Sequence, residues 1–294
     1  SLVGSEMCIR DRVSVALAVA TAVFVVGPIL HTLGVPNGLL RRRALYAAVT
    51  AASFAWRVYA LLRIAPARTD GGDPLYYHTQ ANTVARGLGF IEPLNWIAHG
   101  KQVATAVHGP GYTVYLSLFS RLGASTWFDH RMASSLIGSA SVLLAIVITR
   151  RLAGTTAALI AGTFATFYPN LWTIDGVLFP EGLFIFCCGL AILFAYRWAD
   201  HHRRTDAAGL GLAIGAAALT RSEGIFLIGL LCIPLVWMAR AALSRREQLA
   251  AYGLMLLGCL VFVGPWTVRN MSTFDTFVPL STNGNELHVY SNCD

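Results

Sequence analysis

The chain has 294 residues, of which 55% are hydrophobic and 13% charged, and its mean hydropathy is +0.58. Soluble domains carry about 25% charged residues, so this composition excludes a water-soluble globular protein. The net charge of +7 lies mainly on arginines in short connections between apolar runs. That distribution is typical of the cytoplasmic loops of membrane proteins and not of a nucleic-acid-binding surface. We therefore expect an all-α, multi-pass transmembrane helical bundle with membrane lipid around it and no nucleic-acid partner.

Residues 1–12 show no periodicity and resemble a translated sequencing leader, so we expect them to be artefactual and exclude them from the fold. Apolar runs predict a segment at 13–30, whose orientation stays open, and a span at 44–62 that runs outward from the cytoplasmic Arg41–Arg43 cluster. Further spans are predicted at 132–148, 155–167, 182–195, 210–219, 224–237 and 254–263. We therefore expect a transmembrane domain over 13–264, followed by the start of an external loop or domain over 265–294.

The apolar run at 112–122 is too short to cross a bilayer comfortably. If it did cross, every later arginine cluster would fall outside, contrary to the usual positive-inside distribution. We therefore expect a re-entrant or surface-lying segment, which places the polar loop 66–111 outside, with juxtamembrane helices including one at 76–88. The same count brings the loop 170–181, the turn 221–223 and the segment from 265 to this extracytoplasmic face of the plasma membrane.

Six short motifs carry a resemblance to a known family. They are Asp73-Pro-Leu-Tyr-Tyr77, His108-Gly-Pro-Gly-Tyr112, Tyr168-Pro-Asn-Leu-Trp172 with Glu181, Leu219-Thr-Arg-Ser-Glu223, Pro265-Trp-Thr-Val-Arg269-Asn270 and Leu280-Ser-Thr-Asn-Gly284. In order and spacing they resemble the N-terminal half of the membrane glycosyltransferases that include the protein O-mannosyltransferases and aminoarabinose transferases, a glycosyltransferase family 39-like group with the C-type fold. The resemblance covers about residues 41–294 and implies that a C-terminal half is missing.

The family resemblance implies transfer of a sugar from a polyprenyl-phosphate donor to an acceptor hydroxyl of a glycan, lipid or protein. Asp73 matches the family's acid in the first loop and would act as the general base, because a carboxylate within hydrogen-bond reach can take the hydroxyl proton. The alternative is that Asp73 only caps the helix that follows, in which case Asp70 is the next candidate. Pro74 stands where many members have a second acid, which leaves open whether a divalent cation takes part. We predict no metal ligands.

The departing phosphate needs cationic partners, and arginine suits phosphate through its fork of donors. We expect Arg57, Arg221 and Arg269 to supply them, although Arg57 could instead extend toward lipid headgroups. Arg63 and Lys101 are weaker alternatives for the same role.

The remaining expected substrate contacts are Tyr77, His108, Glu181 and Glu223. Each has a purely structural alternative: hydrogen bonding for His108, a favourable helix N-terminus for Glu181, and a local ion pair with Arg221 for Glu223.

Two other functions fit the same composition. A transporter or flippase for a lipid-linked sugar would place its ionisable groups near the middle of the membrane on broken helices, whereas here the polar residues gather at one predicted face. A non-catalytic remnant of the family is the second alternative. The sequence favours an inverting glycosyltransferase over both.

Overall fold

The computed structural model describes residues 38–64 and 71–283. Across these residues the chain is helical, and the extended backbone is limited to one isolated bridge between Ile91 and Ala104. The predicted segment 13–30, the leader 1–12 and Asp70 lie outside the described residues.

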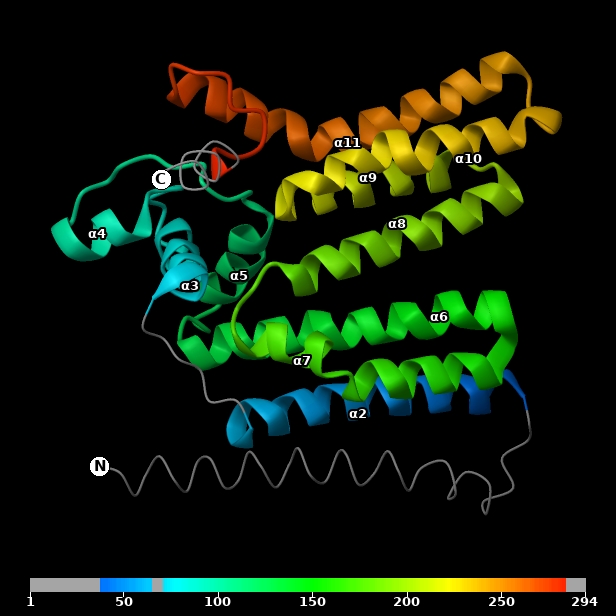
Figure 1. Cartoon of the computed structure of the whole chain (residues 1–294), viewed down its shortest axis with the longest axis horizontal. Coiled ribbons are helices and arrows are strands. Elements are labelled where there is room, and N and C mark those ends of the chain that lie inside the picture. The colour runs from blue at the N-terminus through cyan, green and yellow to red at the C-terminus, as the bar shows by residue number, and fades with distance from the viewer. Residues whose placement is uncertain (1–37, 65–70, 284–294) are drawn as a thin grey trace, which may run out of the picture. The chain divides into compact units, whose positions relative to one another are not determined.

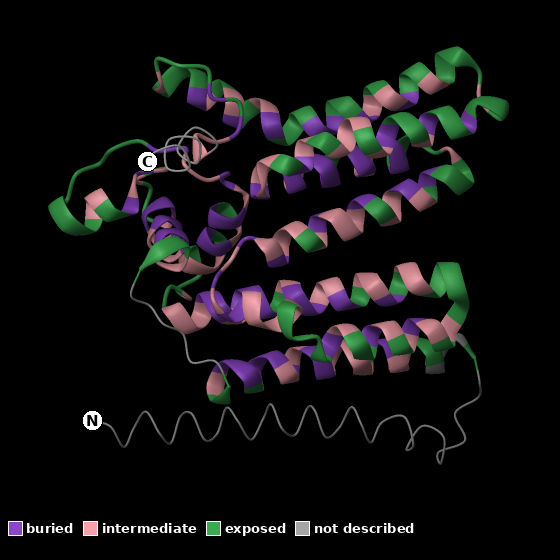
Figure 2. Ribbon diagram, in the orientation of Figure 1, coloured by how far each residue is buried: buried purple, intermediate pink, exposed green. Residues whose placement is uncertain are grey.

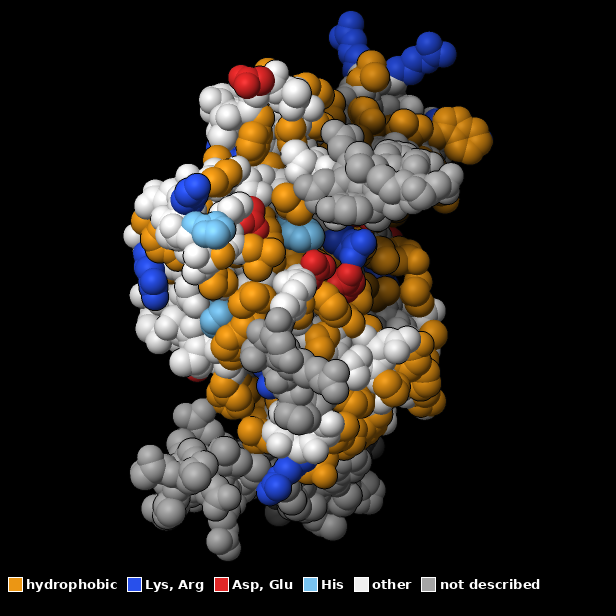
Figure 3. All heavy atoms as spheres, turned by 60° about the vertical axis from the view of Figure 1, so that its left-hand side comes forward, with side chains coloured by type: hydrophobic (Ala, Val, Ile, Leu, Met, Phe, Trp, Pro, Cys, Tyr) orange, Lys and Arg blue, Asp and Glu red, His pale blue; other side chains and the backbone are white. Residues whose placement is uncertain are grey.

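Five of the described helical segments are long and apolar enough to cross a membrane. They are Arg42–Arg63, Trp127–Phe167, Glu181–His201, Ser222–Ala241 and Arg245–Thr273. Many of their large hydrophobic side chains are exposed, as at Ile160, Phe164 and Leu257, and hydrophobic groups cover much of the surface seen in Figure 3. An apolar exterior of this kind suits contact with lipid. The prediction of an all-α, multi-pass membrane protein is confirmed.

The described residues divide into two compact units, 38–64 and 71–74 with 126–182, and 75–125 with 183–283. In the first unit, α2 (Leu39–Arg63) packs against α6 (Trp127–Phe167), and α7 (Pro169–Gly176) follows. Figure 1 shows α6 doubling back on itself. A Cβ atom at Gly162 would lie only 2.5 Å from Cγ1 of Ile146, so the two halves of α6 are in contact.

The reversal in α6 occurs at Gly154, where φ is 82° and ψ is −175°. Residues with a side chain rarely adopt this backbone conformation, whereas glycine adopts it without steric cost. The two arms of α6 correspond to the spans predicted at 132–148 and 155–167. Val142 and Ile146 of the first arm pack against Ala158 of the second and against Tyr46 of α2.

In the second unit, α8 (Glu181–His201), α9 (Arg204–Thr220) and α11 (Arg245–Thr273) form the main apolar core. Short helical pieces run between α9 and α11: η1 (Ser222–Phe226), the π-helical η2 (Ile228–Cys232), α10 (Ile233–Met238) and η3 (Ala239–Ala241). Glycines bring α9 and α11 close together, because a Cβ at Gly211 would lie 2.0 Å from the carbonyl oxygen of Met255. Small residues serve this purpose in many membrane helix pairs, and Figure 2 shows buried residues along the length of α9.

The polar loop between the first and second spans contains α3 (Gly72–Ala85), α4 (Pro93–His99) and α5 (Gly111–Arg121). At about 1.5 Å per residue, the 11 residues of α5 extend about 16 Å, roughly half of a bilayer core. It is not among the candidate spans, which agrees with the expectation for residues 112–122.

Two helices extend beyond the sequence prediction. The predicted loop 170–181 begins with α7, because Pro169 fits the first helical position, where its missing N–H is not needed. The last span was expected over 254–263, but α11 runs from Arg245 through Pro265 to Thr273. The external segment expected to start at residue 265 therefore begins in helical form.

Candidate functional site

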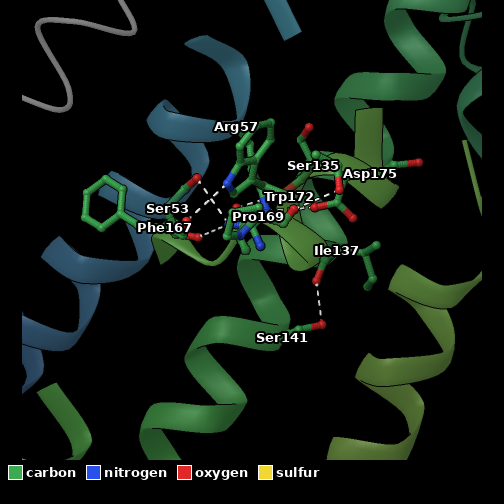
Figure 4. A network of polar contacts seen from close by, with 12 residues as sticks. Ser53, Arg57, Ser135, Ile137, Ser141, Phe167, Pro169, Trp172 and Asp175 are labelled. Atoms are coloured by element: carbon green, nitrogen blue, oxygen red, sulfur yellow. Dashed lines mark hydrogen bonds and ion pairs between the residues drawn. The ribbon is translucent and has the colours of Figure 1, made fainter. Parts of the chain in front are cut away.

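A buried ion pair in the first unit joins α2 to α7. Nε of Arg57 lies 2.7 Å from Oδ2 of Asp175, and the two side chains are 2% and 1% exposed. The same guanidinium donates through Nη1 to the hydroxyl and the carbonyl of Ser53, one turn earlier on α2. Figure 4 shows the Arg57 side chain between Ser53 and Asp175. Burial raises the pKa of the Asp175 carboxyl, and the Arg57 charge opposes that rise.

A second buried arginine contacts the next residue of the same segment. Nε of Arg131 on α6 donates to the carbonyl oxygen of Gly176 at 2.6 Å. Glu181, which the sequence predicts as a substrate contact, is the first residue of α8 and is half-buried. Its carboxylate therefore lies at a helix N-terminus, where the helix dipole favours a negative charge.

Asp73 occupies the first turn of α3, and its side chain is exposed. Tyr77 follows one turn later and is 2% exposed. A carboxylate in the first turn of a helix also stabilises that helix, so the position fits the structural alternative as well as a role for Asp73 as a base.

His108 lies against a tyrosine pair of α3 in the second unit. Its ring centroid is 4.7 Å from that of Tyr76 and 5.1 Å from that of Tyr77. Gln80 donates to the Tyr76 hydroxyl at 2.9 Å, and Thr113 of α5 donates to Gln80 at 2.8 Å. Burial raises the pKa of Tyr76. This cluster connects the motif that begins at Asp73 to the motif that begins at His108.

The His108-Gly-Pro-Gly motif also contacts the end of α9 through its backbone. A Cβ at Gly109 would lie 2.3 Å from the carbonyl oxygen of Leu219, and one at Gly111 would lie 2.8 Å from Oγ1 of Thr220. Real Cβ atoms do not approach this closely, so only glycine permits the contact. These glycines bring His108 close to the motif containing Arg221.

Two further motifs meet at the same place. The hydroxyls of Ser222 and Ser281 lie 3.1 Å apart, and the backbone N–H of Thr282 donates to the carbonyl of Ala106 at 2.9 Å. The indole of Trp266 donates to the carbonyl of Leu280 at 2.6 Å. Together with the tyrosines of the Asp73 motif, which contact His108, five of the six motifs found in the sequence are therefore linked by contacts within the second unit. Ser222 and Ser281 were not predicted as site residues.

The predicted phosphate ligands have different surroundings. Arg269 donates through Nη1 to the carbonyl of Thr105 at 2.9 Å and through Nη2 to that of Phe90 at 3.2 Å. Its guanidinium also lies 4.9 Å from the ring centroid of Trp266. Arg221 instead pairs with Glu223 at 3.3 Å, and the two side chains are 37% and 61% exposed.

The apolar helices and the polar motifs collected at their connections define an integral membrane protein with a candidate site built from loop segments and helix ends. The model of the dolichyl-phosphate-mannose-protein mannosyltransferase family matches residues 107–268. This match covers more than half of the chain, which belongs to that family and to the membrane glycosyltransferases in general. It confirms the resemblance recognised from the six motifs. None of the curated proteins matches the chain.

Proposed function

We propose that this protein transfers a sugar from a polyprenyl-phosphate donor to an acceptor hydroxyl at the extracytoplasmic face of the plasma membrane. The acceptor oxygen forms a bond to the anomeric carbon as the bond from that carbon to the phosphate oxygen breaks, and polyprenyl phosphate leaves. One displacement of this kind inverts the anomeric configuration. Asp73 takes the proton of the attacking hydroxyl.

The observation that supports Asp73 most is its accessibility. It is an exposed carboxylate within a family motif, whereas Asp175 is buried and paired with Arg57. A general base must reach the acceptor hydroxyl within hydrogen-bond distance, and an exposed group at the start of α3 can do so.

We further propose that Arg221 is the arginine that meets the donor phosphate. Its side chain is 37% exposed, whereas Arg57 is buried against a carboxylate and Arg269 donates to two carbonyl groups. Tyr77, His108, Glu181 and Glu223 are the proposed further contacts. The described residues contain no group of three or more His, Cys, Asp or Glu arranged to hold a metal ion, and we assign no metal ligands.

The proposal is tested by following labelled sugar from a polyprenyl-phosphate donor to acceptors in membrane vesicles that contain the full-length protein. Asp73→Asn should abolish transfer while protein level and donor binding persist, because the amide cannot accept the proton. Asp200→Asn, which changes an exposed acid near the other end of α8, is the matched control and should transfer normally. Full activity of Asp73→Asn would make this assignment wrong and would direct the same test to Asp70.

A transporter or flippase for a lipid-linked sugar remains the second candidate, and the same vesicles distinguish it. Movement of the intact lipid-linked sugar across the membrane, with no transfer from any donor, would replace the glycosyltransferase proposal. Sugar transfer that depends on Asp73, with no movement of the intact lipid-linked sugar, would exclude the transporter function.

A further inference from the structure

Residues 175–181 run from the end of α7 to the first residue of α8, and two arginines from two different helices hold them. Arg57 of α2 pairs with the side chain of Asp175, and Arg131 of α6 donates to the backbone of Gly176. The arginines are 1% and 7% exposed. The last two residues of α7 are thus each contacted by a buried guanidinium, and buried arginines are uncommon unless they are paired.

The packing around Asp175 leaves no room for another arrangement. A Cβ at Gly138 on α6 would lie 2.0 Å from Oδ2 of Asp175, and a Cβ at Gly182 would lie 2.7 Å from Oδ1. The carboxylate therefore fits only because glycines stand on both sides of it. Gly182 directly follows Glu181, so Asp175 is packed against the start of α8.

The backbone of the segment is also constrained. Leu178 has a φ of 57°, a left-handed conformation that is strained for a residue with a side chain. Its side chain is nevertheless 1% exposed, so the surrounding structure imposes this conformation. Backbone strain maintained by its surroundings is found preferentially at functional sites.

The ion pair contributes little net stability to the fold. Burying two charges costs several kcal/mol of desolvation, and well-packed apolar residues often replace such a pair without loss. Oδ1 of Asp175 has no hydrogen-bond partner among the described residues, so the desolvation of this carboxylate is only partly compensated. A pair that contributes little net stability but fixes one geometry suits a positioning role.

We propose that Arg57 and Asp175 form a positioning pair that sets the conformation of residues 175–181 and thereby orients the Glu181 carboxylate toward the substrate. In this arrangement the Arg57 guanidinium pairs with the Asp175 carboxylate and does not bind the donor phosphate. The inference rests on the proposed glycosyltransferase function, because Glu181 is a substrate contact only within it.

The first test is a double-mutant cycle between Asp175→Asn and Glu181→Gln, measured as sugar transfer by the full-length protein. Each single variant should lower kcat by about tenfold or more, and the double variant should be no worse than the poorer single variant, since both changes remove the same contact. Effects that multiply independently would overturn the positioning role.

A buried carboxylate elsewhere in the chain, paired with the exposed Arg197, provides the matched control. Asp206 of α9 is 1% exposed at its side chain and lies 2.8 Å from Nε of Arg197. Asp206→Asn therefore makes the same chemical change at another buried carboxylate. It should lower thermal stability to a similar degree, yet its effect on transfer should multiply independently with that of Glu181→Gln. If both Asp→Asn changes couple equally to Glu181→Gln, the Asp175→Asn effect is general destabilisation and the positioning role is wrong.

The role of Arg57 is tested by replacing both partners with apolar residues. Arg57→Met alone leaves Asp175 buried without its counter-ion and should lower kcat, whereas Arg57→Met with Asp175→Leu should recover part of that loss. The KM for the polyprenyl-phosphate donor should stay within about twofold of wild type in the double variant. A donor KM that rises by tenfold or more in both variants would show that Arg57 binds the phosphate and would contradict the inference.

Hydrogen exchange separates failure of this inference from failure of the proposed function. Asp175→Asn should speed amide exchange over residues 175–181 with little change in α9, regardless of whether transfer is observed. Unchanged exchange in this segment would overturn the positioning pair even in an active enzyme. Absent transfer by wild type would instead count against the proposed function.

Discussion

The two units hold an arginine in different ways: Arg57 is buried, and Arg269 is half-buried. In the first unit, Arg57 is neutralised by the carboxylate of Asp175, so the pair carries no net charge. In the second unit, Arg269 donates to the carbonyls of Thr105 and Phe90 and lies beside aromatic rings, so its positive charge remains. A carbonyl partner costs less desolvation than a second buried ion. An arginine within an apolar helix therefore does not by itself indicate a substrate phosphate.

The units also differ in how they hold their connecting segments. Side chains from α2 and α6 hold residues 175–181 in the first unit. In the second unit the backbone of residues 109–111 packs directly on the backbone at the end of α9, through glycines. Two side chains that hold a segment can be replaced together by another pair that fits. Two backbones in direct contact leave no room for an added atom. The second unit should therefore be the less tolerant of substitution.

The largest effect is expected for Gly109→Ala. Its Cβ would lie 2.3 Å from the carbonyl oxygen of Leu219, and because that neighbour is backbone, α9 and the His108 motif must separate. We expect sugar transfer to fall by about a hundredfold or more, since displacements near 1 Å can cost that much. Transfer assays and the yield of folded protein on size exclusion measure the result.

Gly253→Ala on α11 is the control, since no atom lies within 4 Å of its added Cβ. It should fold and transfer normally, because alanine is the better helix former. Wild-type transfer by Gly109→Ala would show that the contact between residue 109 and α9 is dispensable, and the difference between the units would disappear.

Smaller effects are expected from replacing Arg269 and Arg221 by methionine, one at a time. Arg269→Met removes two charge-assisted hydrogen bonds to carbonyls and should lower the free energy of unfolding by about 1–3 kcal/mol. Arg221→Met, at a side chain that is 37% exposed, should leave stability nearly unchanged and raise the KM for the donor. Thermal unfolding in detergent and transfer kinetics separate the two outcomes. The reverse pattern would exchange the roles of the two arginines.

Much of the fold follows from one-dimensional patterns. Hydrophobic runs predict the spans, and the short length of the run at 112–122 predicts a segment that does not cross comfortably, because both predictions depend on the bilayer thickness and the rise of a helix. The reversal at Gly154 is consistent with two predicted runs on either side of Arg150 and Arg151. Helix ends were less accurate, since a proline can start a helix, as at Pro169, or lie within one, as at Pro265.

The site is less predictable because its partners are distant in sequence. Arg57 and Asp175 are 118 residues apart, and Asp175 belongs to none of the predicted site motifs. Its one available signal was an acid within the apolar run Thr173–Phe179. Burial decides whether an arginine meets a carboxylate, a carbonyl or solvent, and composition does not encode burial at single positions. The same limit explains why the sequence alone does not place the glycines beside His108 against the end of α9.

The smallest predicted effect is a pH dependence in the second unit, which arises from the half-buried histidine His78. Burial lowers the pKa of His78 on α3 from its ordinary value to about 4, whereas in the unfolded chain it titrates near about 6.5. As the pH falls below about 6.5, the unfolded chain takes up the proton first, so the folded state loses stability until the pH approaches the folded-state pKa. The midpoint temperature of thermal unfolding in detergent should decrease when the pH is lowered from 7.5 to 5. The decrease should be smaller in His78→Gln, which keeps a polar group near Asn82. An equal fall in both proteins would place the titrating group elsewhere, and a midpoint that rises on acidification would reverse the sign and show that protonated His78 is stabilised by an anion.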